Sequence, residues 1–248
     1  MDPAVLREDM VAGLEHESKG CLESETVSVA MRSVSREAFV PDGQNAYTDR
    51  SFERLGTRVL APSTVARLLE PLAPEPGDSV LVVGAGVGYT AAVLAEIVGP
   101  EQVHAVDITR RLVTEARKNL SDAGHDAVLV DRRDGADGLP EYAPYDRILL
   151  EAAAVRPPRA LLDQLAAGGR LVMPLGTGEQ SIATVDHDGT VTRLGGCAFE
   201  PMLVEGERAD TVERNRTRRE ERERARRAER RRRGWEQDWI DWEESRSG

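Results

Sequence analysis

Lysine and cysteine are both scarce in this 248-residue chain. Lysine occurs only at Lys19 and Lys118, although the chain carries 44 acidic residues. Two cysteines, Cys21 and Cys197, cannot form a disulfide framework or a four-ligand zinc site, which favours a reducing compartment. No stretch approaches the ~18 uninterrupted apolar residues of a membrane span, and no basic-then-apolar leader follows Met1. We therefore expect a cytoplasmic protein that is neither exported nor inserted into a membrane.

Aromatic residues are also few. They make up 4% of the chain, whereas hydrophobic residues as a whole make up 40%. The core must therefore consist mainly of Val, Leu, Ala and Ile, a composition that suits a parallel sheet covered by helices on both faces.

The negative charge is unevenly distributed. The formal net charge is -11, but residues 216–233 hold eleven arginines against four glutamates, so this stretch carries about +7 and the rest of the chain about -18. An acidic, lysine-poor surface is typical of adaptation to high salt, because it stays soluble where salt screens repulsion. Frequent arginine codons in a GC-rich genome explain the scarcity of lysine equally well.

A repeated alternation of strands and helices begins near residue 77. A continuous apolar run over residues 79–86 ends in glycines, as expected of a buried parallel strand that leads into a helix. Alternating residues around Asp188-Gly189, over 181–196, predict an antiparallel hairpin near the end of this region. The fold class is therefore α/β, a doubly wound and mostly parallel sheet with a C-terminal hairpin. The other elements predicted in it are strands over 102–108, 127–131, 145–153 and 170–176, and helices over 89–98, 109–124 and 158–169.

Ahead of this core we expect a helical lead-in layer. Residues 10–31 have the pattern of a helix, and residues 36–49 that of a loop. A second helix is predicted over residues 63–72, with Ser63 at its N-cap and a proline-rich segment after it.

A glycine-rich stretch follows the first predicted strand. Gly84-Ala85-Gly86-Val87-Gly88 lies between a strand and a helix, where glycines let the backbone approach a ligand closely and the helix start offers free N–H groups. A dinucleotide fingerprint needs a small residue at position 89, which is Tyr89 in this chain, so nicotinamide and flavin cofactors are disfavoured.

Acidic residues follow the next two strands. Asp107 ends the second strand, about 20 residues beyond the loop, where a carboxylate can accept hydrogen bonds from both ribose hydroxyls. Asp134 and Gly135 follow the third strand, where they can reach an adenine edge. An ordinary helix cap explains Asp107 equally well when it is taken alone, but the three features together favour a nucleoside-containing ligand. The predicted cofactor-binding residues are Gly84, Ala85, Gly86, Gly88, Tyr89, Asp107, Ile108, Asp134 and Gly135.

At these residues the chain resembles the protein-L-isoaspartate O-methyltransferase family. The resemblance runs from about residue 10 to residue 202 and includes AMRSVSREAFVPDGQNAYTD, VLVVGAGVGYTAAVLAEIVG, DGADGLPEYAPYDRIL, LLDQLAAGGRLVMPLG and FEPM. It implies a Rossmann-like methyltransferase fold and S-adenosyl-L-methionine as the methyl donor. It also implies protein repair: the α-carboxylate of an L-isoaspartyl residue accepts the methyl group, the ester cyclises to a succinimide, and hydrolysis returns some normal aspartate.

Chemistry of this kind requires few reactive side chains. His16, His104, His125 and His187 show no metal-ligand spacing, and no Ser/His/Asp or Cys/His pattern stands out. A carboxylate is ionised at pH 7 and a sulfonium is a good leaving group, so the main requirement is to align the two groups in line.

The first of three departures from the family pattern lies before the helix at Ser63. The family usually has Gly-Gln-Thr-Ile-Ser-x-Pro there, with the serine near the transferred methyl group, whereas residues 56–62 of this chain place Leu60 at the position of the serine. Loss of one such contact costs about 1 to 3 kcal/mol, on the order of 10- to 100-fold in rate. Thr57, Ser63 and Thr64 are candidates to compensate, and the loop that carries them is the expected substrate lid.

The other departures lie beside the expected cofactor site. Val82 stands where the family commonly has an acidic residue, which removes part of a polar network around the methionine end of the donor. Glu151 ends the fourth strand where the family typically has a small or hydroxyl residue, and a carboxylate there would repel an isoaspartyl carboxylate. Arg58 is predicted either to neutralise Glu151, to clamp a substrate carboxylate bidentately, or to remain solvated.

An Arg- and Glu-rich tail lies outside the resemblance. Its tryptophans, Trp235, Trp239 and Trp242, fall on one stripe of a helix. We expect the stripe to pack against the protein itself or a second copy, to bind a protein partner, or to contact nucleic acid; the acidic body makes nucleic acid the least favoured partner. The predicted division is a methyltransferase domain over 1–206, made of the lead-in layer (1–76) and the core (77–206), and a charged helical tail over 207–248.

Two alternative functions follow from the departures. The first is a methyltransferase with a different acceptor, selected by Leu60, Arg58 and Glu151. The second is a catalytically degenerate binding module that acts through its tail.

Overall fold

A computed structural model describes residues 2–16 and 19–203. The tryptophan stripe of the predicted tail and its partners lie outside the described residues, as does the boundary predicted between residues 206 and 207. The division predicted between residues 76 and 77 stays a prediction.

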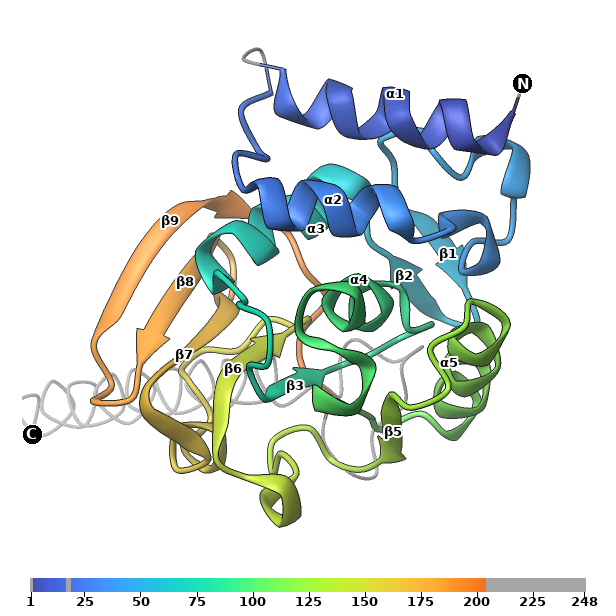
Figure 1. The fold of residues 1–248 in the computed structure, drawn as a ribbon. Coiled ribbons are helices and arrows are strands. Elements are labelled where there is room, and N and C mark those ends of the chain that lie inside the picture. Colours follow the sequence, from blue (N-terminus) through green and yellow to red (C-terminus); the bar gives the residue numbers. More distant parts are fainter. Residues whose placement is uncertain (1, 17–18, 204–248) are drawn as a thin grey trace, which may run out of the picture.

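A seven-stranded sheet forms the centre of the molecule (Figure 1). Its order is β5-β4-β3-β6-β7-β8-β9; pairing is parallel from β5 to β7 and antiparallel from β7 to β9. This confirms the predicted α/β class, with its mostly parallel sheet and C-terminal hairpin. The strands are β3 (Val80–Val83), β4 (Val103–Asp107), β5 (Leu129–Arg132), β6 (Tyr145–Leu150), β7 (Leu165–Gly176), β8 (Gln180–Asp186) and β9 (Val191–Cys197).

The chain winds in two directions from β3. Helix α4 (Tyr89–Val98) leads from β3 to β4, and α5 (Arg110–Asp122) leads from β4 to β5. The chain then crosses to the other side of β3, where β6 pairs with it in register Val83↔Leu150. The direction therefore reverses between β3 and β6, and the crevice outside the carboxyl ends of such strands is where open α/β sheets bind ligands.

Strand alternation divides the core into two layers. Val80 and Val82 face a cluster formed with the helices α3 (Pro62–Leu72), α4 and α5, whereas Leu81 and Val83 face the opposite cluster. The second face is covered mainly by residues 136–165, which include the 3-10 turn η4 (Pro140–Tyr142) and one short helix, α6 (Arg159–Leu162).

The helix predicted over residues 158–169 is mostly wrong. Only Arg159–Leu162 is helical, and β7 already begins at Leu165, which pairs with Tyr145. A glycine pair ends the pattern that suggested a helix: Gly168 has φ +81, and a Cβ at Gly169 would lie 2.9 Å from the carbonyl oxygen of Tyr145. The pair therefore lets the strand pass close to its neighbour.

The N-terminal layer contains two helices where one was predicted over residues 10–31. Helix α1 (Pro3–Glu15) begins at an Asp2 cap, and α2 (Glu25–Ser33) begins at Ser24, whose side chain accepts the N–H of Val27. The chain turns between them, with Gly20 at φ +50. The segment predicted as a loop over 36–49 contains two 3-10 turns, η1 (Arg36–Ala38) and η2 (Gly43–Asn45). A third, η3 (Pro100–Gln102), precedes β4.

A small antiparallel ribbon, β1 (Phe52–Arg54) and β2 (Thr57–Val59), was not predicted. Its turn residues Leu55 and Gly56 have φ values of +54 and +80, which matches a two-residue hairpin turn with left-handed backbone. Leu-Gly is a weak sequence signal for such a turn. Helix α3 then begins at Pro62 with Ala61 at its N-cap, so the N-cap predicted at Ser63 is wrong by two residues; proline is well suited to the first helical position.

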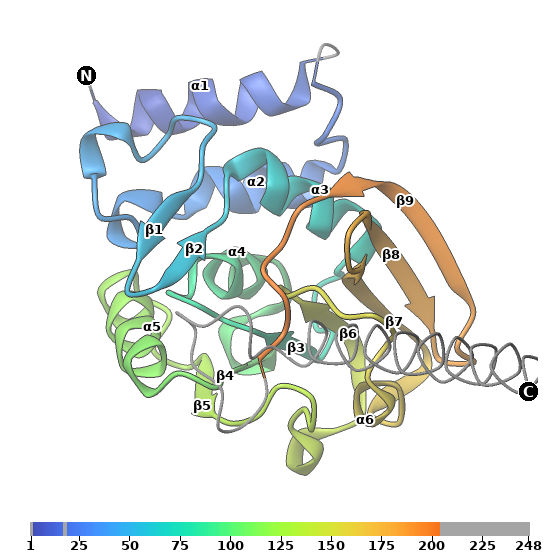
Figure 2. The same ribbon diagram turned by 180° about the vertical axis from the view of Figure 1, so that it is seen from behind.

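The ribbon and the chain end meet at the carboxyl edge of the sheet. Figure 2 shows the ribbon beside α5 and the segment after β9 passing the ends of the central strands. Pro201 bridges Ala153, and the N–H of Met202 donates to the carbonyl of Ala153 at 2.8 Å. No helix among the described residues combines the length and the apolar character needed to cross a membrane.

Candidate functional site

A pocket lies at the point where the winding direction reverses. It encloses about 810 Å³, counting the space open to solvent at its mouth. Its walls come from the carboxyl ends of β3, β4 and β6, from the turn of the β1–β2 ribbon, and from the segment after β9. With Gly135, which follows β5, six separate parts of the chain thus enclose one hollow.

The glycine-rich turn contributes one residue, Gly84, to the lining of this pocket. Gly84 has φ +85 and its N–H donates to the carbonyl of Val106 at 2.9 Å, which ties the turn to the neighbouring strand. A Cβ at Gly84 would lie 3.8 Å from the Cβ of Glu151. The absence of a side chain therefore leaves room for a ligand between the ends of β3 and β6. Of the other residues predicted in the turn, Ala85, Gly86, Gly88 and Tyr89 stand behind the lining of the pocket.

Asp107 connects the end of β4 to the glycine-rich turn. Its Oδ2 accepts the N–H of Gly86 at 3.0 Å, and its Oδ1 accepts the N–H of Thr109 at 2.8 Å. Burial raises the pKa of Asp107, and these hydrogen bonds act in the opposite direction. Each carboxylate oxygen keeps a lone pair for a ligand hydroxyl, because an ionised carboxylate accepts about four hydrogen bonds. Asp107 and Ile108 both line the pocket.

The structure separates the pair predicted after the third strand. Gly135 lines the pocket, and a Cβ at this position would lie 2.4 Å from Cγ1 of Val83, so only glycine fits. Asp134 lies outside the lining, and its Oδ1 accepts the N–H of Ala136 at 2.9 Å. A contact of Asp134 with an adenine stays a prediction.

Glu151 forms the wall opposite Asp107. Its backbone N–H donates to the carbonyl of Val83 at 2.9 Å, which fixes it at the end of β6. The carboxyl group is hydrogen bonded to Thr90 of α4, but its Oε1 atom is buried without a hydrogen-bond partner. Burial raises the pKa of Glu151 to about 7, the nearby carboxylate of Asp107 adds to the rise, and the Thr90 hydrogen bond opposes it.

The predicted substrate lid contributes one side chain to the pocket. Thr57 lines it, with its side chain 3.9 Å from the position of a Cβ on Gly86. Leu60 instead packs against the helical side of the core, and its carbonyl oxygen accepts a hydrogen bond from Nη2 of Arg36 at 2.6 Å. The backbone N–H of Ser63 donates to Asp49 at 2.9 Å, which places Ser63 away from the pocket.

Arg58 reaches a different glutamate from the one considered in the sequence. Its Nη2 lies 3.5 Å from Oε1 of Glu200, which lines the pocket. The side chains are 44% and 59% exposed, so water screens this pair. Val82, the other departure from the family pattern, is fully buried in the core between the sheet and the helices.

A buried arginine ties the lid to the N-terminal layer. Arg36 donates from Nε to the carbonyl of Ala46 at 2.9 Å, in addition to its bond to Leu60, and its guanidinium lies 4.5 Å above the ring of Tyr89. Burial lowers the pKa of Arg36. The backbone of the lid is therefore held by a residue 24 positions earlier in the chain.

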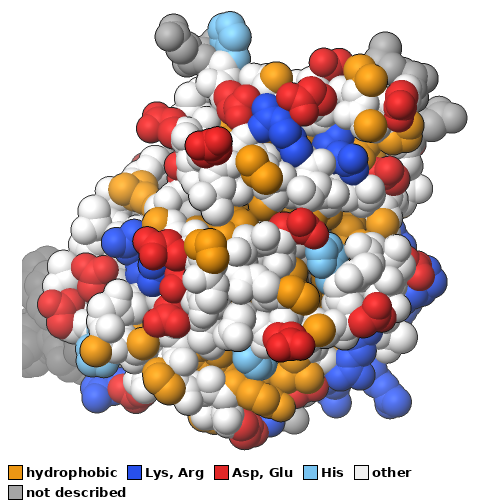
Figure 3. All heavy atoms as spheres, in the orientation of Figure 1, with side chains coloured by type: hydrophobic (Ala, Val, Ile, Leu, Met, Phe, Trp, Pro, Cys, Tyr) orange, Lys and Arg blue, Asp and Glu red, His pale blue; other side chains and the backbone are white. Residues whose placement is uncertain are grey.

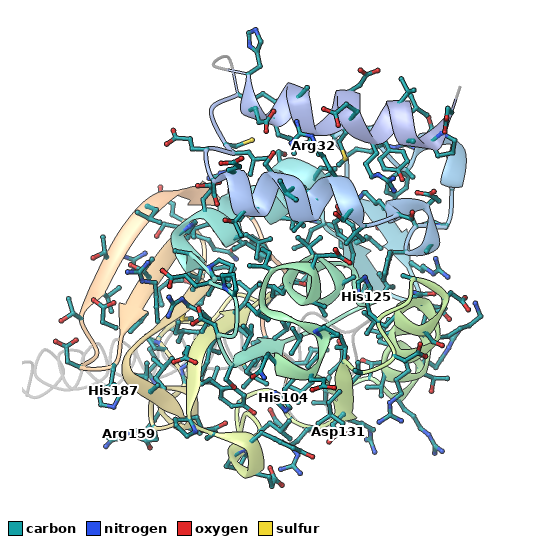
Figure 4. The ribbon with its side chains drawn as sticks, in the orientation of Figure 1. Arg32, His104, His125, Asp131, Arg159 and His187 are labelled. Atoms are coloured by element: carbon teal, nitrogen blue, oxygen red, sulfur yellow. The ribbon has the colours of Figure 1, made fainter. Side chains whose placement is uncertain are left out.

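No metal site is found among the described residues. They contain no group of three or more His, Cys, Asp or Glu side chains placed to hold an ion. Figure 4 shows His104, His125 and His187 on separate parts of the fold.

Sequence reasoning missed the segment after β9. Glu200, Pro201 and Met202 line the pocket, although FEPM had been noted only as part of the family resemblance. The apolar lining residues Val83, Val106 and Leu150 were also missed, because each belongs to a run that reads simply as a buried strand. A pairing between residues 153 and 201 has no local sequence signal.

These features define a class of protein. A left-handed glycine turn after the first parallel strand, a buried carboxylate after the second, and a pocket where the strand order reverses form the site of a Rossmann-like, S-adenosylmethionine-dependent methyltransferase. The pocket fits such a donor because an adenosyl group needs a close backbone approach, which Gly84 and Gly135 provide, and hydroxyl acceptors, which Asp107 provides.

Comparison with known proteins gives the family. The model of the protein-L-isoaspartate(D-aspartate) O-methyltransferase family matches residues 7–205, and the chain belongs to this family. The family uses S-adenosylmethionine as its methyl donor.

Curated relatives are similar over most of the globular part. A protein-L-isoaspartate O-methyltransferase of Methanopyrus kandleri is 43% identical over 80% of this chain and 92% of its own length. One from Aeropyrum pernix is 45% identical over 67% of this chain and 66% of its own length. A solved protein-L-isoaspartate O-methyltransferase superposes with a TM-score of 0.70 at 25% identity, over 83% of this chain and 67% of that chain. A Plasmodium falciparum structure in complex with S-adenosyl-L-homocysteine has the same fold, with a TM-score of 0.70 at 20% identity over 79% of this chain and 97% of that chain.

Proposed function

We propose that this chain transfers a methyl group from S-adenosyl-L-methionine to the α-carboxylate of L-isoaspartyl residues in damaged proteins. The observation that carries the proposal is the shared pocket of Gly84 and Asp107 at the ends of adjacent parallel strands. The family match over residues 7–205 supports the same reaction.

The cofactor half of the pocket is formed by the residues that follow the first three parallel strands. Gly84 and Gly135 allow the donor to lie against the backbone, and Asp107 accepts hydrogen bonds from the ribose hydroxyls. Ile108 forms the apolar surface next to Asp107, and Asp134 is the proposed contact for the adenine edge. When bound, the donor supplies a methyl group on a positively charged sulfur, which an ionised carboxylate can attack without a general base.

The acceptor half centres on Thr57 and Arg58. Thr57 lines the pocket directly, and Arg58 lies at its mouth beside Glu200. An exposed ion pair of this kind contributes about 0 to 1 kcal/mol, so an incoming substrate carboxylate can replace Glu200 and bind Arg58 bidentately.

Methyl transfer to a synthetic L-isoaspartyl peptide tests the proposal. The expected result is a base-labile methyl ester on this peptide and none on the matched peptide with normal aspartate. Leu60→Ser places a hydroxyl at the lid position where the family has one; because Leu60 packs against the core and does not line the pocket, the rate should stay within about threefold of the wild type. Leu60→Ala is the matched control, because it removes the same apolar side chain without adding a hydrogen-bonding group.

A different acceptor is the second candidate function. The observation that favours it is Leu60, which gives the lid an apolar side chain where the family has a hydroxyl. Donor binding without ester formation on the isoaspartyl peptide, in both the wild type and Leu60→Ser, would contradict repair and leave this candidate.

We further propose a cytoplasmic enzyme adapted to high salt, and the acidic surface supports the adaptation to salt. Figure 3 shows acidic side chains spread over the N-terminal layer and the face below it, with basic ones gathered at several places between them. Salt that screens this repulsion should stabilise the fold. Unfolding of the full chain at increasing potassium chloride measures the effect, and a free energy of unfolding that falls with salt would contradict it.

A further inference from the structure

The charge of the pocket is one-sided. Among the described residues that line it, the ionisable side chains are Asp107, Glu151 and Glu200, and none is basic. They come from three elements: the end of β4, the end of β6 and the segment after β9. Among the described residues, Arg58 pairs with the exposed Glu200. A ligand that enters this pocket therefore meets a negative field.

Of the three carboxylates, Glu151 receives the least stabilisation from hydrogen-bond donors and water. Asp107 is neutralised in part by two backbone N–H groups, and Glu200 is largely in water. Glu151 has only the Thr90 side chain, and its buried Oε1 has no donor. A buried carboxylate oxygen without a partner costs about 1 to 3 kcal/mol, or more when ionised, so this atom is suited to a ligand that brings a donor or a positive charge.

The position of Glu151 relates it to the donor. Its Cβ lies 3.8 Å from the position of a Cβ on Gly84, which follows β3. Because β3 lies between β4 and β6 in the sheet, Glu151 and Asp107 flank the end of β3 from opposite sides. If Asp107 receives the ribose, then Glu151 faces the part of the donor beyond the ribose. In S-adenosylmethionine that part carries the sulfonium and the α-ammonium group.

We propose that Glu151 binds the cationic methionine end of S-adenosylmethionine and thereby gives the pocket a preference for charged donors. The inference rests on the proposed function, because it takes the donor from it. A negative charge close to a positive ligand in a low-dielectric pocket strengthens binding much more than the same pair in water. Glu151 is therefore a cofactor-binding residue of this chain and not only a source of repulsion toward the acceptor.

Calorimetry with four adenosyl compounds tests the assignment. They are S-adenosylmethionine, which has both cationic groups; S-adenosylhomocysteine, which has the ammonium only; 5′-dimethylsulfonio-5′-deoxyadenosine, which has the sulfonium only; and 5′-methylthioadenosine, which has neither. Glu151→Gln keeps the size of the side chain and its contact with Thr90. Glu101→Gln is the matched control, because it removes one negative charge from an exposed turn at the other edge of the sheet.

The expected result is a selective loss. Glu151→Gln should lower the affinity for S-adenosylmethionine by about tenfold or more, as expected for the loss of a charge-assisted hydrogen bond. The affinity for 5′-methylthioadenosine should stay within about twofold of that of the wild type. A parallel loss for S-adenosylhomocysteine identifies the ammonium as the contact, and a parallel loss for the dimethylsulfonio compound identifies the sulfonium. Equal losses for all four compounds, or no loss for any, would overturn the proposal.

Proton release provides a second measurement that needs no variant. Because burial raises the pKa of Glu151 to about 7, part of its carboxyl groups are protonated at pH 7 in the free protein. Binding of a cation favours the ionised form, so the wild type should release a fraction of a proton per S-adenosylmethionine and none with 5′-methylthioadenosine. Binding enthalpies in two buffers of different ionisation enthalpy give this number. No difference between the two ligands would contradict the role of Glu151, whereas a wild type that binds none of the four compounds would contradict the proposed function itself.

Discussion

The carboxyl edge of the parallel sheet and the N-terminal layer manage charge in opposite ways. At the sheet edge, Asp107 is buried and accepts hydrogen bonds from backbone N–H groups, and Glu151 is hydrogen bonded to a hydroxyl and has a buried Oε1 atom with no hydrogen-bond partner. In the N-terminal layer, charges pair with one another near the surface: Arg32 contacts Glu8 and Glu15 at 2.9 Å each, between α1 and α2 (Figure 4). Buried charges without ionic partners are costly, and exposed pairs are nearly neutral in energy. Unpaired charge at the sheet edge therefore marks the place where a ligand acts, while paired charge in the layer contributes to folding.

The largest expected effect is at Asp107. Asp107→Ala removes the acceptor for the N–H of Gly86 and for the ribose hydroxyls. Each hydrogen bond to a charged group is worth about 1.5 to 3 kcal/mol, so affinity for S-adenosylmethionine should fall by about 100-fold or more. Calorimetry measures it, with Asp122→Ala at the exposed end of α5 as the control. An affinity within a few-fold of the wild type would contradict the claim that unpaired charge marks the ligand site, because Asp107 would then be no more important for binding than a surface carboxylate.

The next effect concerns the space at the sheet edge. Gly135→Ala places a Cβ 2.4 Å from Val83 and 3.4 Å from Met202, so it should destabilise the fold by about 1 to 3 kcal/mol through overpacking. Urea unfolding measures the change, and Gly178→Ala, which meets nothing within 4 Å, is the control. Val83→Ala in the same chain should relieve the clash and recover part of the loss. Equal stability of the two single variants would show that the edge is looser than the structure indicates.

The third effect concerns Arg58, which lies on the ribbon between the N-terminal layer and the sheet edge. Arg58→Gln should raise KM for the isoaspartyl peptide by about tenfold, as expected for loss of a charge-assisted contact, and leave the affinity for the donor unchanged. Glu200→Gln removes the competing carboxylate and should lower the same KM by about two- to threefold. Initial rates over a range of peptide concentrations separate KM from kcat. If KM is unchanged in Arg58→Gln, the arginine is a solvated surface charge.

The smallest effect is expected in the N-terminal layer. Hydrogen bonds from Arg32 and then Ser28 lower the pKa of Glu15 from 4.5 to about 2. The stabilisation from Glu15 is therefore fully present above pH 4.5 and fades as the pH falls from 4.5 toward 2. Because Glu15 is 38% exposed, Glu15→Gln should cost less than about 1 kcal/mol at pH 7. Urea unfolding at pH 7 and pH 3 should show the difference from the wild type shrinking, with the exposed Asp9→Asn as the control. A difference that grows at pH 3 would contradict the sign.

The cofactor half could be predicted because its signals are local. Gly84 follows a continuous apolar strand, and Asp107 ends the next one, so each element points to the same edge of a parallel sheet. The acceptor half could not be predicted to the same extent. The ribbon turn at Leu55 and Gly56 has weak turn chemistry, and Arg58 was given Glu151 as a possible partner, whereas the fold pairs it with Glu200.

Helix boundaries show the same limit. The pattern over residues 10–31 contains two helices, because Gly20 and the capping Ser24 interrupt it. The pattern over 158–169 is divided: Arg159–Leu162 is helical, and the strand begins at Leu165, where pairing with Tyr145 outweighs helix propensity. In both places the apolar spacing suits a helix; a local turn and cap decide the outcome in the first, and pairing with a distant strand decides it in the second.

By itself, the sequence determined the strand–helix alternation, the glycine turn and the carboxylate after the second strand, since these depend on backbone freedom and on residues close together in the chain. Only the tertiary structure decided that Glu151 places a buried, unpartnered oxygen in the same pocket as Asp107, and that Glu200 returns from the far end of the domain to this pocket. The physical reason is that burial and charge environment are properties of neighbours in space. Asp107 and Glu151 are 44 residues apart in the chain, and they line one pocket only when the sheet has placed β3 between β4 and β6.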